Sequence, residues 1–374
     1  MQLFCVKPTV STFDRFHEFA ETFSLGAGDL IFTERVLFES YIQKEDLPCP
    51  VVLKDQYDTG EPKEETVDAI LRDIRHLPLR RVIAIGGGII DIAKILCVRD
   101  AYPCRRVMEQ SIPLAPDKEL IVLPSTCGTG SEVTFGGIVT MKDTGFKTGV
   151  LAPELSAVHA VLVPELLTGL PVKVMLHCSV DALGHAMESY VSATRGNDMA
   201  RAVGARAISL LMNNYAVLTE EGLDARFRLY KRFLTASCLA GMAVNNGGAG
   251  PVHALAYPVG ETYQMSHGES IYQFLAPVFR FYEDRADGPL LEELRQLMVP
   301  ALKRAGVYSG HAFDDLETLL EQVYPNRRLR KCGMTEADVE PFVRNIFQAK
   351  QRLLTASYCP FTEADAAAIY RARL

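Results

Sequence analysis

The sequence predicts two domains, an α/β domain with a parallel sheet over residues 1–165 and an all-α domain over residues 166–374. Before Pro164, short apolar runs alternate with amphipathic helical patterns, which is typical of an α/β fold. After Pro164 the strand patterns nearly vanish and long helical patterns dominate. The length of 374 residues is also that of two ordinary domains.

The strands expected in the first domain are almost entirely apolar. The run "DLIFT" ends at Thr33, directly before Glu34, and "PVVLK" follows it. Three further runs complete the set: "RVIAI" (81–85), "ELIVLP" (119–124) and "AVLVP" (160–164). Strands that are apolar on both faces belong to a parallel sheet covered by helices, and "ETVDAILRDIRHL" (65–77) predicts one such helix.

Helical periodicity dominates the second domain. The predicted helices cover 179–192, 199–218, 225–244, 289–306 and 340–357. The stretch "VHALAYPVGETYQMSHGES" (252–270) differs, because it contains a proline and glycines and shows little helical period. It nevertheless contains two of the eight histidines of the chain, His253 and His267.

Composition argues against several classes of function. A net charge of −7 and a pI near 5.7 give no reason to expect binding to nucleic acid or to an anionic membrane. The most apolar stretch is interrupted by Asp91 and Lys94, so no bilayer-spanning segment is expected, and the N-terminus lacks a signal-peptide pattern. The nine cysteines include no C-x-x-C pair, which favours reduced thiols and a cytoplasmic location.

Two turns are suited to a dinucleotide. In "IAIGGGIIDIAK", Gly86, Gly87 and Gly88 would let the backbone approach a diphosphate at the start of a helix. Taken alone, this motif could equally be a tight turn without a ligand. A second polar turn, "LPSTCGTGSEVT", with Ser125 and Thr126, follows another strand. Two such turns at the carboxyl ends of parallel strands favour a dinucleotide site.

Glu34 lies just beyond the first of these apolar strands. A carboxylate in this place can accept hydrogen bonds from the 2′-hydroxyl of a ribose and repel a 2′-phosphate. This favours NAD over NADP. The alternative interpretation is a solvated surface glutamate.

Four side chains could hold a metal ion. Asp181, His185 and Glu188 lie at helical spacing, so one helix face would present a carboxylate and an imidazole from adjacent turns. With His253 and His267 added, one aspartate and three histidines can surround Fe²⁺ or Zn²⁺. An open coordination position would make the cation a Lewis acid for a substrate hydroxyl. A closed site that only stabilises the helices is the alternative.

Four segments in order carry a resemblance: "GGGIIDIAK", "PSTCGTGSEVT", "DALGHAMESYVS" and "HALAYPVGETYQMSHGES". Over its full length the chain resembles the iron-containing (group III) alcohol dehydrogenases. The resemblance implies a Rossmann-like domain followed by a helical domain, the dehydroquinate synthase-like fold, with metal and nicotinamide in one cleft. It also implies a homodimer or larger homo-oligomer. The segments "HALAYP", "RLRKCGM" and "QRLLTASYCPFTEAD" are similar to the branch that acts on 4-hydroxybutyrate with NAD.

The resemblance also implies roles for individual residues. The implied metal ligands are Asp181, His185, His253 and His267, and the implied cofactor-binding residues are Glu34, Gly86, Gly87, Gly88, Ser125, Thr126, Thr134 and Lys147.

The chain departs from the family pattern in two places. Only Ile89 and Ile90 separate Gly88 from Asp91, so the glycine loop is one residue short. Tyr257 stands where many relatives have a histidine that helps to move the proton. Because a phenol with a pKa of about 10 is a poor base at neutral pH, we expect Tyr257 to orient substrate or relay a proton through water.

The function expected is hydride transfer between NAD and a small primary alcohol or aldehyde, namely 4-hydroxybutyrate and succinate semialdehyde. Alternatives are a dehydrogenase for another alcohol or a diol such as 1,3-propanediol, and a non-catalytic protein that binds NAD or metal. A lyase of the dehydroquinate-synthase type would need basic phosphate-binding residues near the metal, which the sequence does not offer. A carboxylate substrate also needs a cationic anchor, for which Lys147 and Arg195 are candidates.

Overall fold

The computed structural model describes residues 3–60, 62–145, 147–286 and 288–374, and the chain divides into two units. The α/β unit consists of Val6–Thr126 and Ser131–Leu170. The helical unit consists of Pro171–Leu374 with Cys127–Gly130 and the N-terminal residues up to Cys5. The middle of the second polar turn therefore packs with the helical unit.

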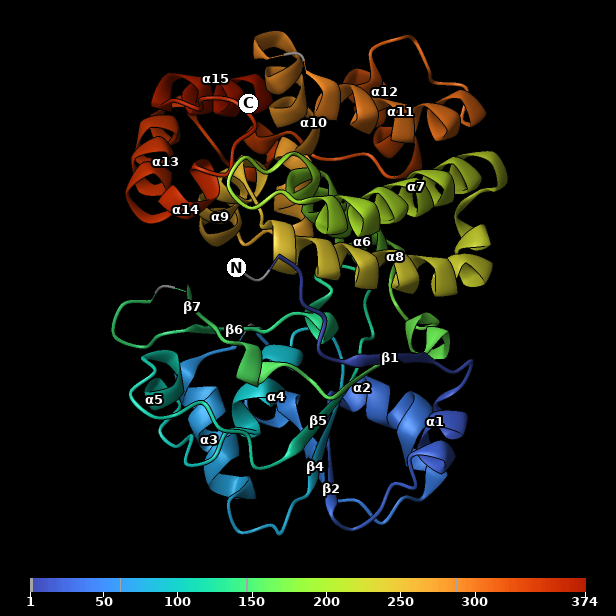
Figure 1. The fold of residues 1–374 in the computed structure, drawn as a ribbon, viewed down its shortest axis with the longest axis vertical. Coiled ribbons are helices and arrows are strands. Elements are labelled where there is room, and N and C mark those ends of the chain that lie inside the picture. The colour runs from blue at the N-terminus through green and yellow to red at the C-terminus, as the bar shows by residue number, and fades with distance from the viewer. Residues whose placement is uncertain (1–2, 61, 146, 287) are drawn as a thin grey trace. The chain divides into compact units, whose positions relative to one another are not determined.

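A six-stranded sheet, parallel throughout, forms the centre of the α/β unit (Figure 1). Its strands are β1 (Thr9–Thr12), β2 (Asp29–Thr33), β3 (Val51–Leu53), β4 (Arg81–Ile85), β5 (Glu119–Leu123) and β8 (His159–Leu162), in the order β1-β8-β5-β4-β2-β3. The predicted parallel sheet is confirmed. The strand order reverses between β2 and β4. After β2 the chain adds β3 on one side of it, and the next strand, β4, pairs with the other side of β2.

The register aligns the ends of three neighbouring strands. Thr33 pairs with Ile85, and Ile85 pairs with Leu123. The segments that follow β2, β4 and β5 therefore leave the sheet side by side at its carboxyl edge.

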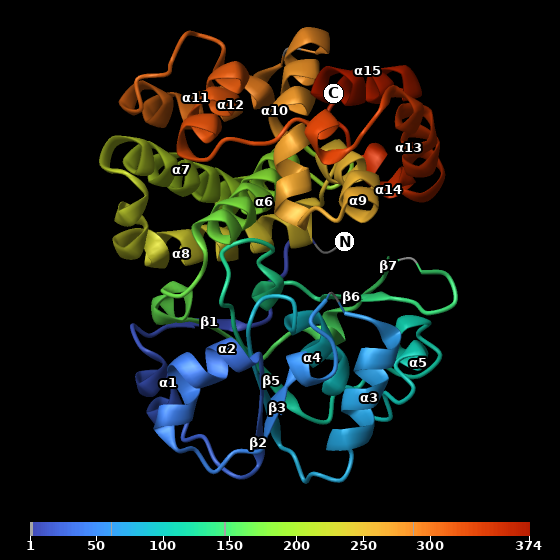
Figure 2. The ribbon, with the colours of Figure 1, turned by 180° about the vertical axis from the view of Figure 1, so that it is seen from behind.

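Helices cover both faces of this sheet, which is why its central strands are apolar on both sides. The helices α1 (Phe16–Thr22) and α2 (Arg35–Leu37) lie on one side, and α3 (Glu64–Ile74), α4 (Ile90–Leu96) and α5 (Arg105–Met108) lie on the other (Figures 1 and 2). Leu30, Phe32 and Val82 belong to the same buried core as Val67 and Ile70 of α3. An antiparallel pair, β6 (Gly136–Thr140) and β7 (Lys147–Leu151), forms a separate small sheet.

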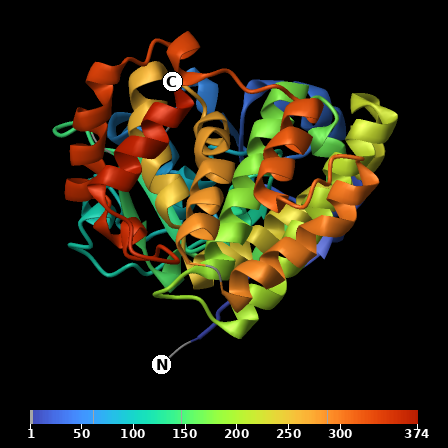
Figure 3. The same ribbon diagram turned by 90° about the horizontal axis from the view of Figure 1, so that it is seen from above.

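The helical unit contains no strand among the residues that the structure describes. Its helices are α6 (Val172–Val191), α7 (Asp198–Glu221), α8 (Arg226–Gly247), α9 (Pro251–Tyr263), α10 (His267–Arg285), α11 (Pro289–Arg304), α12 (Ala312–Val323), α13 (Glu336–Ala349), α14 (Gln351–Leu354) and α15 (Glu363–Arg373). Helix α6, drawn in green near the middle of Figure 3, packs against α7, α8 and α10. No helix within the described ranges combines the length and the apolarity that crossing a bilayer requires.

The stretch 252–270 is mostly helical although its sequence shows little helical period, since α9 ends at Tyr263 and α10 begins at His267. Pro251 occupies the first turn of α9, where a missing N–H leaves no helical bond unmade. Pro258 lies inside the same helix, and Gln264 ends it with a left-handed backbone. The amphipathic pattern is absent because α9 is buried on most of its faces, and a helix surrounded by protein shows no apolar stripe.

Candidate functional site

Helix α6 carries the first part of the site deep inside the helical unit. Asp181, His185 and Glu188 lie on one face of this helix, and all three are buried. Leu183 and Met187 of the same helix are also buried. The polar face of α6 is therefore enclosed by protein, and its charges need partners.

Three helices bring four side chains together. Oδ1 of Asp181 lies 3.5 Å from Nε2 of His253, near the start of α9, and 3.5 Å from Nε2 of His267, the first residue of α10. Nε2 of His185 lies 3.9 Å from the same oxygen. Ligand atoms bound tetrahedrally at about 2.1 Å from a cation are about 3.4 Å apart, so these spacings suit a metal ion.

The tightest part of the cluster has three members. One ligand atom each from Asp181, His253 and His267 lie within 4.8 Å of one another. His185 lies beside them, with its ring stacked on that of His253 at 4.5 Å between centroids. One carboxylate with several imidazoles is a donor set for Fe²⁺ or Zn²⁺.

Among the described residues, three buried atoms of the cluster lack the hydrogen bonds that buried polar atoms normally make, one of them Nδ1 of His185. Oδ1 of Asp181 and Nε2 of His253 have no hydrogen-bond partner within the described ranges. A buried polar atom without a partner destabilises the folded state by about 1–3 kcal/mol. A divalent cation would satisfy both atoms, so these residues fit a metal ion.

Glu188 holds His253 in place. Its carboxylate accepts hydrogen bonds from the backbone N–H of Gly250 at 2.9 Å and of Val252 at 2.6 Å, and Nδ1 of His253 donates to it at 2.5 Å. With the proton on Nδ1, the lone pair of Nε2 faces Asp181, as metal binding requires. Gly250 is needed here because a Cβ atom would lie 3.0 Å from Oε1 of Glu188.

The charges of the cluster are set by burial and by one another. Burial raises the pKa of Asp181, but the imidazoles of His185 and His267 outweigh it and hold that pKa well below its usual range. Burial lowers the pKa of His185 to about 3. Burial also lowers the pKa of His253, but the carboxylates of Glu188 and Asp181 raise it to about 9. A bound cation would therefore compete with a proton on His253.

Tyr257 lies one helical turn after His253 on α9. Its ring centroid is 5.8 Å from that of His267, at an interplanar angle of 40°. The phenol thus stands beside the ligand cluster on the side of His267, whose side chain is 30% exposed.

In the α/β unit, several of the predicted cofactor residues lie at the carboxyl edge of the parallel sheet. Glu34 follows β2, Gly86 follows β4, and Ser125 lies two residues after β5. The amide of Gly86 donates to the carbonyl of Leu123, and the amide of Ser125 donates to the carbonyl of Gly86. Open α/β sheets bind nucleotides at the carboxyl edge where the strand order reverses, which here is between β2 and β4.

The three glycines of the first turn differ in what surrounds them. A Cβ atom on Gly86 would lie 2.9 Å from the side chain of Ile89, and one on Gly87 would lie 3.1 Å from the side chain of Thr126. A Cβ atom on Gly88 would meet no described atom within 4 Å, and this residue is exposed. The first two glycines are required by packing, whereas Gly88 leaves backbone open to a ligand.

A buried lysine organises the second turn. Nζ of Lys94, from α4, donates to the hydroxyls of Ser131 at 3.0 Å and Thr134 at 3.1 Å and to the carbonyl of Gly136 at 2.7 Å. The hydroxyl of Thr134 is therefore engaged within its own unit. The position of Lys94 inside the apolar run "IDIAKIL" is the feature of the sequence that could have indicated a buried lysine. Lys147 begins β7.

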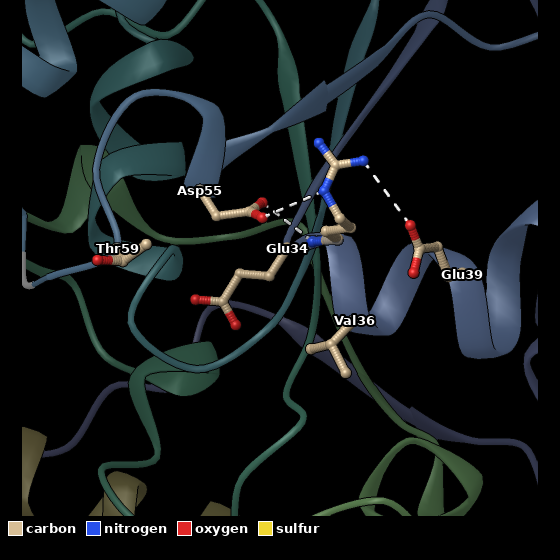
Figure 4. Close-up of a pocket in the computed structure, with 6 residues that line it drawn as sticks. Glu34, Val36, Glu39, Asp55 and Thr59 are labelled. Carbon is tan, nitrogen blue, oxygen red and sulfur yellow. Dashed lines mark hydrogen bonds and ion pairs between the residues drawn. The ribbon is translucent and has the colours of Figure 1, made fainter.

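A hollow of about 420 Å³ lies beside Glu34 (Figure 4). It is lined by Glu34, Arg35, Val36, Glu39, Asp55 and Thr59. The guanidinium of Arg35 is 3.6 Å from Asp55 and 3.7 Å from Glu39, so its charge is already balanced. The carboxylate of Glu34 has no hydrogen bond or ion pair among the described residues, and burial raises its pKa.

Two family models match the chain. The model described as "Iron-containing alcohol dehydrogenase" matches residues 24–164, and the model described as "Fe-containing alcohol dehydrogenase family, C-terminal" matches residues 175–374. The chain is 37% identical to a 4-hydroxybutyrate dehydrogenase of Clostridium kluyveri, over 99% of each protein. It is 30% identical to long-chain-alcohol dehydrogenase 1 of Geobacillus thermodenitrificans, over 83% of this chain and 79% of that one.

Solved structures have the same fold at lower identity. A 1,3-propanediol oxidoreductase superposes with a TM-score of 0.83 at 21% identity, over the whole of both chains. A sulfoacetaldehyde reductase of Bifidobacterium kashiwanohense, solved with NAD⁺, also has a TM-score of 0.83 at 21% identity and covers all of this chain and 99% of its own.

Proposed function

Because the chain belongs to the iron-containing alcohol dehydrogenase family and is an NAD-dependent alcohol dehydrogenase, we propose that it interconverts 4-hydroxybutyrate and succinate semialdehyde. In the direction of reduction, succinate semialdehyde takes a hydride from NADH and a proton from water, giving 4-hydroxybutyrate and NAD⁺. The 37% identity over nearly the whole chain supports this choice of substrate. The convergence of His253 and His267 on one oxygen of Asp181, each at 3.5 Å, is the observation that carries the chemistry.

The proposed metal ligands are Asp181, His185, His253 and His267. A divalent cation bound there, Fe²⁺ in preference to Zn²⁺, supplies Lewis acidity that polarises the oxygen of the substrate. The residues around it keep the ligands ready. Glu188 holds His253 with Nε2 facing inward, and burial keeps the imidazole of His185 neutral.

For the cofactor, we assign the diphosphate of NAD to the backbone at Gly86–Gly88, with Ser125 and Thr126 beside it. Glu34 would accept hydrogen bonds from the ribose hydroxyls. The acidic hollow around Glu34 disfavours the 2′-phosphate of NADP, because the charge of Arg35 is already balanced by Asp55 and Glu39. Thr134 and Lys147 would line the rest of the cofactor.

Tyr257 is proposed to orient the substrate and to pass a proton between the reacting oxygen and water. Its ring lies beside His267, and its hydroxyl can both donate and accept a hydrogen bond. Tyr257→Phe should therefore lower the rate of hydride transfer while leaving the affinity for NADH unchanged.

An absorbance assay tests the proposal. The protein, loaded separately with Fe²⁺ and with Zn²⁺, is mixed with NADH and one aldehyde at a time, and the decrease at the NADH band is followed. We expect succinate semialdehyde to be the preferred substrate in a panel with butanal and 3-hydroxypropanal, the aldehyde of 1,3-propanediol. A preference for 3-hydroxypropanal would replace the proposed substrate, and no oxidation of NADH with any aldehyde would contradict the enzyme class.

Two further properties belong to the same proposal. A cytoplasmic location is supported by the nine cysteines, all within the described ranges, none of which forms a disulfide. Assembly into a homodimer or a larger homo-oligomer stays a prediction, which sedimentation velocity would test.

A further inference from the structure

Lys350 has a position in the helical unit that the sequence did not indicate. It stands between α13 and α14, and its backbone angles, φ −122° and ψ 26°, break the helix at this point. Its N–H donates to the carbonyl of Ile346 at 2.8 Å, and its own carbonyl accepts from the N–H of Leu353 at 2.9 Å. The backbone of Lys350 is thus held on both sides of the break.

This break lies against α9, the helix that carries His253 and Tyr257. Both α13 and α14 contact α9, and Figures 1 and 2 show the three helices side by side. Nζ of Lys350 stands over the ring of Tyr257, 4.2 Å from its centroid. An ammonium ion at this distance from an aromatic face is attracted to it, so the contact helps to fix the position of the charge.

The same ring lies next to the ligand cluster. Because the centroid of Tyr257 is 5.8 Å from that of His267, the ammonium group is at most about 10 Å from the centre of the His267 imidazole, the limit set by these two steps. The positive charge of Lys350 therefore lies near the proposed metal ligand His267, with the ring of Tyr257 between them.

The substrate has a matching length. Four bonds separate the carboxyl carbon of 4-hydroxybutyrate from its hydroxyl oxygen, which is about 5 Å in an extended chain. At the carboxylate end, the C–O bond and a charge-assisted hydrogen bond add up to about 4 Å, and a ligand bond at the oxygen end adds about 2 Å. The sum is about 11 Å from the ammonium nitrogen to the cation, which is within the limit of about 13 Å set by the two ring contacts and a bond of the cation to His267, about 3 Å from the centre of its ring.

Other cations of the helical unit fit less well. Lys173 and Arg327 both bind the carboxylate of Glu269, at 3.2 Å and 2.6 Å. Arg195, a candidate from the sequence, is exposed and donates to the carbonyl of Asn245 at 2.8 Å. Lys147, the other candidate, is instead one of the residues proposed to line the cofactor.

We propose that Lys350 binds the carboxylate of the substrate and so selects ω-hydroxy acids and their semialdehydes over uncharged alcohols and aldehydes. This inference rests on the proposed function, since it assigns a residue to the charged end of the proposed substrate. The methylene chain of the substrate would lie along the ring of Tyr257. Lys350 would determine specificity and would take no part in hydride transfer.

The experiment compares two aldehydes of the same chain length, succinate semialdehyde with a carboxylate and butanal without one. We expect Lys350→Met to lower kcat/KM for succinate semialdehyde about 100-fold, mainly through KM, because a hydrogen bond between charged groups is lost. The value for butanal should stay within about twofold, since butanal offers no carboxylate to the lysine. Lys350→Arg, which keeps the charge, should restore part of the preference.

A matched control comes from a second lysine over an aromatic ring. Nζ of Lys303 lies 5.2 Å from the ring centroid of Tyr308. Lys303→Met should leave kcat/KM for both aldehydes unchanged. Butyrate provides a measurement independent of turnover. It should inhibit the wild-type protein in competition with succinate semialdehyde, and Lys350→Met should weaken this inhibition by a similar factor.

The outcomes separate the two proposals. If the wild-type protein prefers succinate semialdehyde and Lys350→Met keeps that preference, Lys350 is not the anchor and the proposed function stands. If the wild-type protein shows no preference over butanal, both proposals are overturned. Should Lys350→Met fail to fold, Lys350→Gln is measured in the same way, and an unchanged preference in that variant overturns the inference.

Discussion

The ligand cluster of the helical unit and the glycine turn of the α/β unit would hold their ligands by different means. In the cluster, side-chain atoms of Asp181, His253 and His267 converge, and two of these atoms are buried without a hydrogen-bond partner. In the turn, the absence of side chains leaves backbone accessible at Gly88. A substitution in the cluster should therefore remove a ligand group that no other residue replaces. A substitution in the turn should act only by steric hindrance, because the added side chain occupies space.

The largest effect is expected from a ligand of the cluster. His267→Ala should abolish the retention of metal and lower kcat/KM at least about 1,000-fold. The reason is that the bound cation, acting as a Lewis acid, stabilises the transition state by several kcal/mol. Metal content by inductively coupled plasma mass spectrometry and NADH oxidation measure the two effects. His311→Ala, at an exposed histidine before α12, is the control. Full activity in a His267→Ala protein free of metal would refute the assignment.

A smaller effect should follow from the residue that orients a ligand. Glu188→Gln should weaken metal binding about 10- to 100-fold, because His253 loses the carboxylate that fixes its ring. Titration with Fe²⁺ measures the affinity, and excess metal should restore turnover. Glu293→Gln is the matched control, because Glu293 accepts a hydrogen bond from the hydroxyl of Tyr190 in the same unit. An unchanged affinity in Glu188→Gln would mean that the carboxylate does not set the ring orientation.

Two alanine substitutions in the glycine turn should separate packing from binding. Gly86→Ala should lower the free energy of unfolding by about 1 kcal/mol, since its Cβ atom would crowd Ile89. Gly88→Ala should leave the stability unchanged and raise KM for NADH about tenfold, since its Cβ atom would point into open space. Thermal unfolding and NADH titration check the pair. An unchanged KM for NADH in Gly88→Ala would remove Gly88 from the cofactor site.

The smallest effect concerns Glu34. Glu34→Gln should reduce the preference for NADH over NADPH about tenfold, because a repulsive charge is lost. Burial raises the pKa of Glu34, so the folded protein holds this proton more tightly than the unfolded chain and loses stability as the pH rises through the raised pKa. The free energy of unfolding of the variant should therefore equal that of the wild type near pH 3. At pH 7 it should be higher than that of the wild type by less than about 1 kcal/mol, as measured by denaturant unfolding. A variant less stable than the wild type at pH 7 would contradict this.

Local patterns in the sequence determined much of this protein. The apolar strands, the glycine turn after β4 and the spacing of Asp181 and His185 could all be predicted, because each depends on residues that are close together in the chain. The parallel sheet and the helical second half followed from the same periodicities. Helix α9 could not be predicted, since burial on most of its faces removes the amphipathic pattern by which helices are recognised.

Tertiary structure alone decided the relations between distant residues. Lys94 holds two hydroxyls of a turn far along the chain, Glu188 fixes His253, and Lys350 comes to stand over Tyr257. No sequence period couples such residues, because each contact depends on how separate helices and strands pack. Residue types and local periodicity determined which chemical groups are available. Packing determined which of them meet, because the distances between groups on different elements exist only once the core has formed.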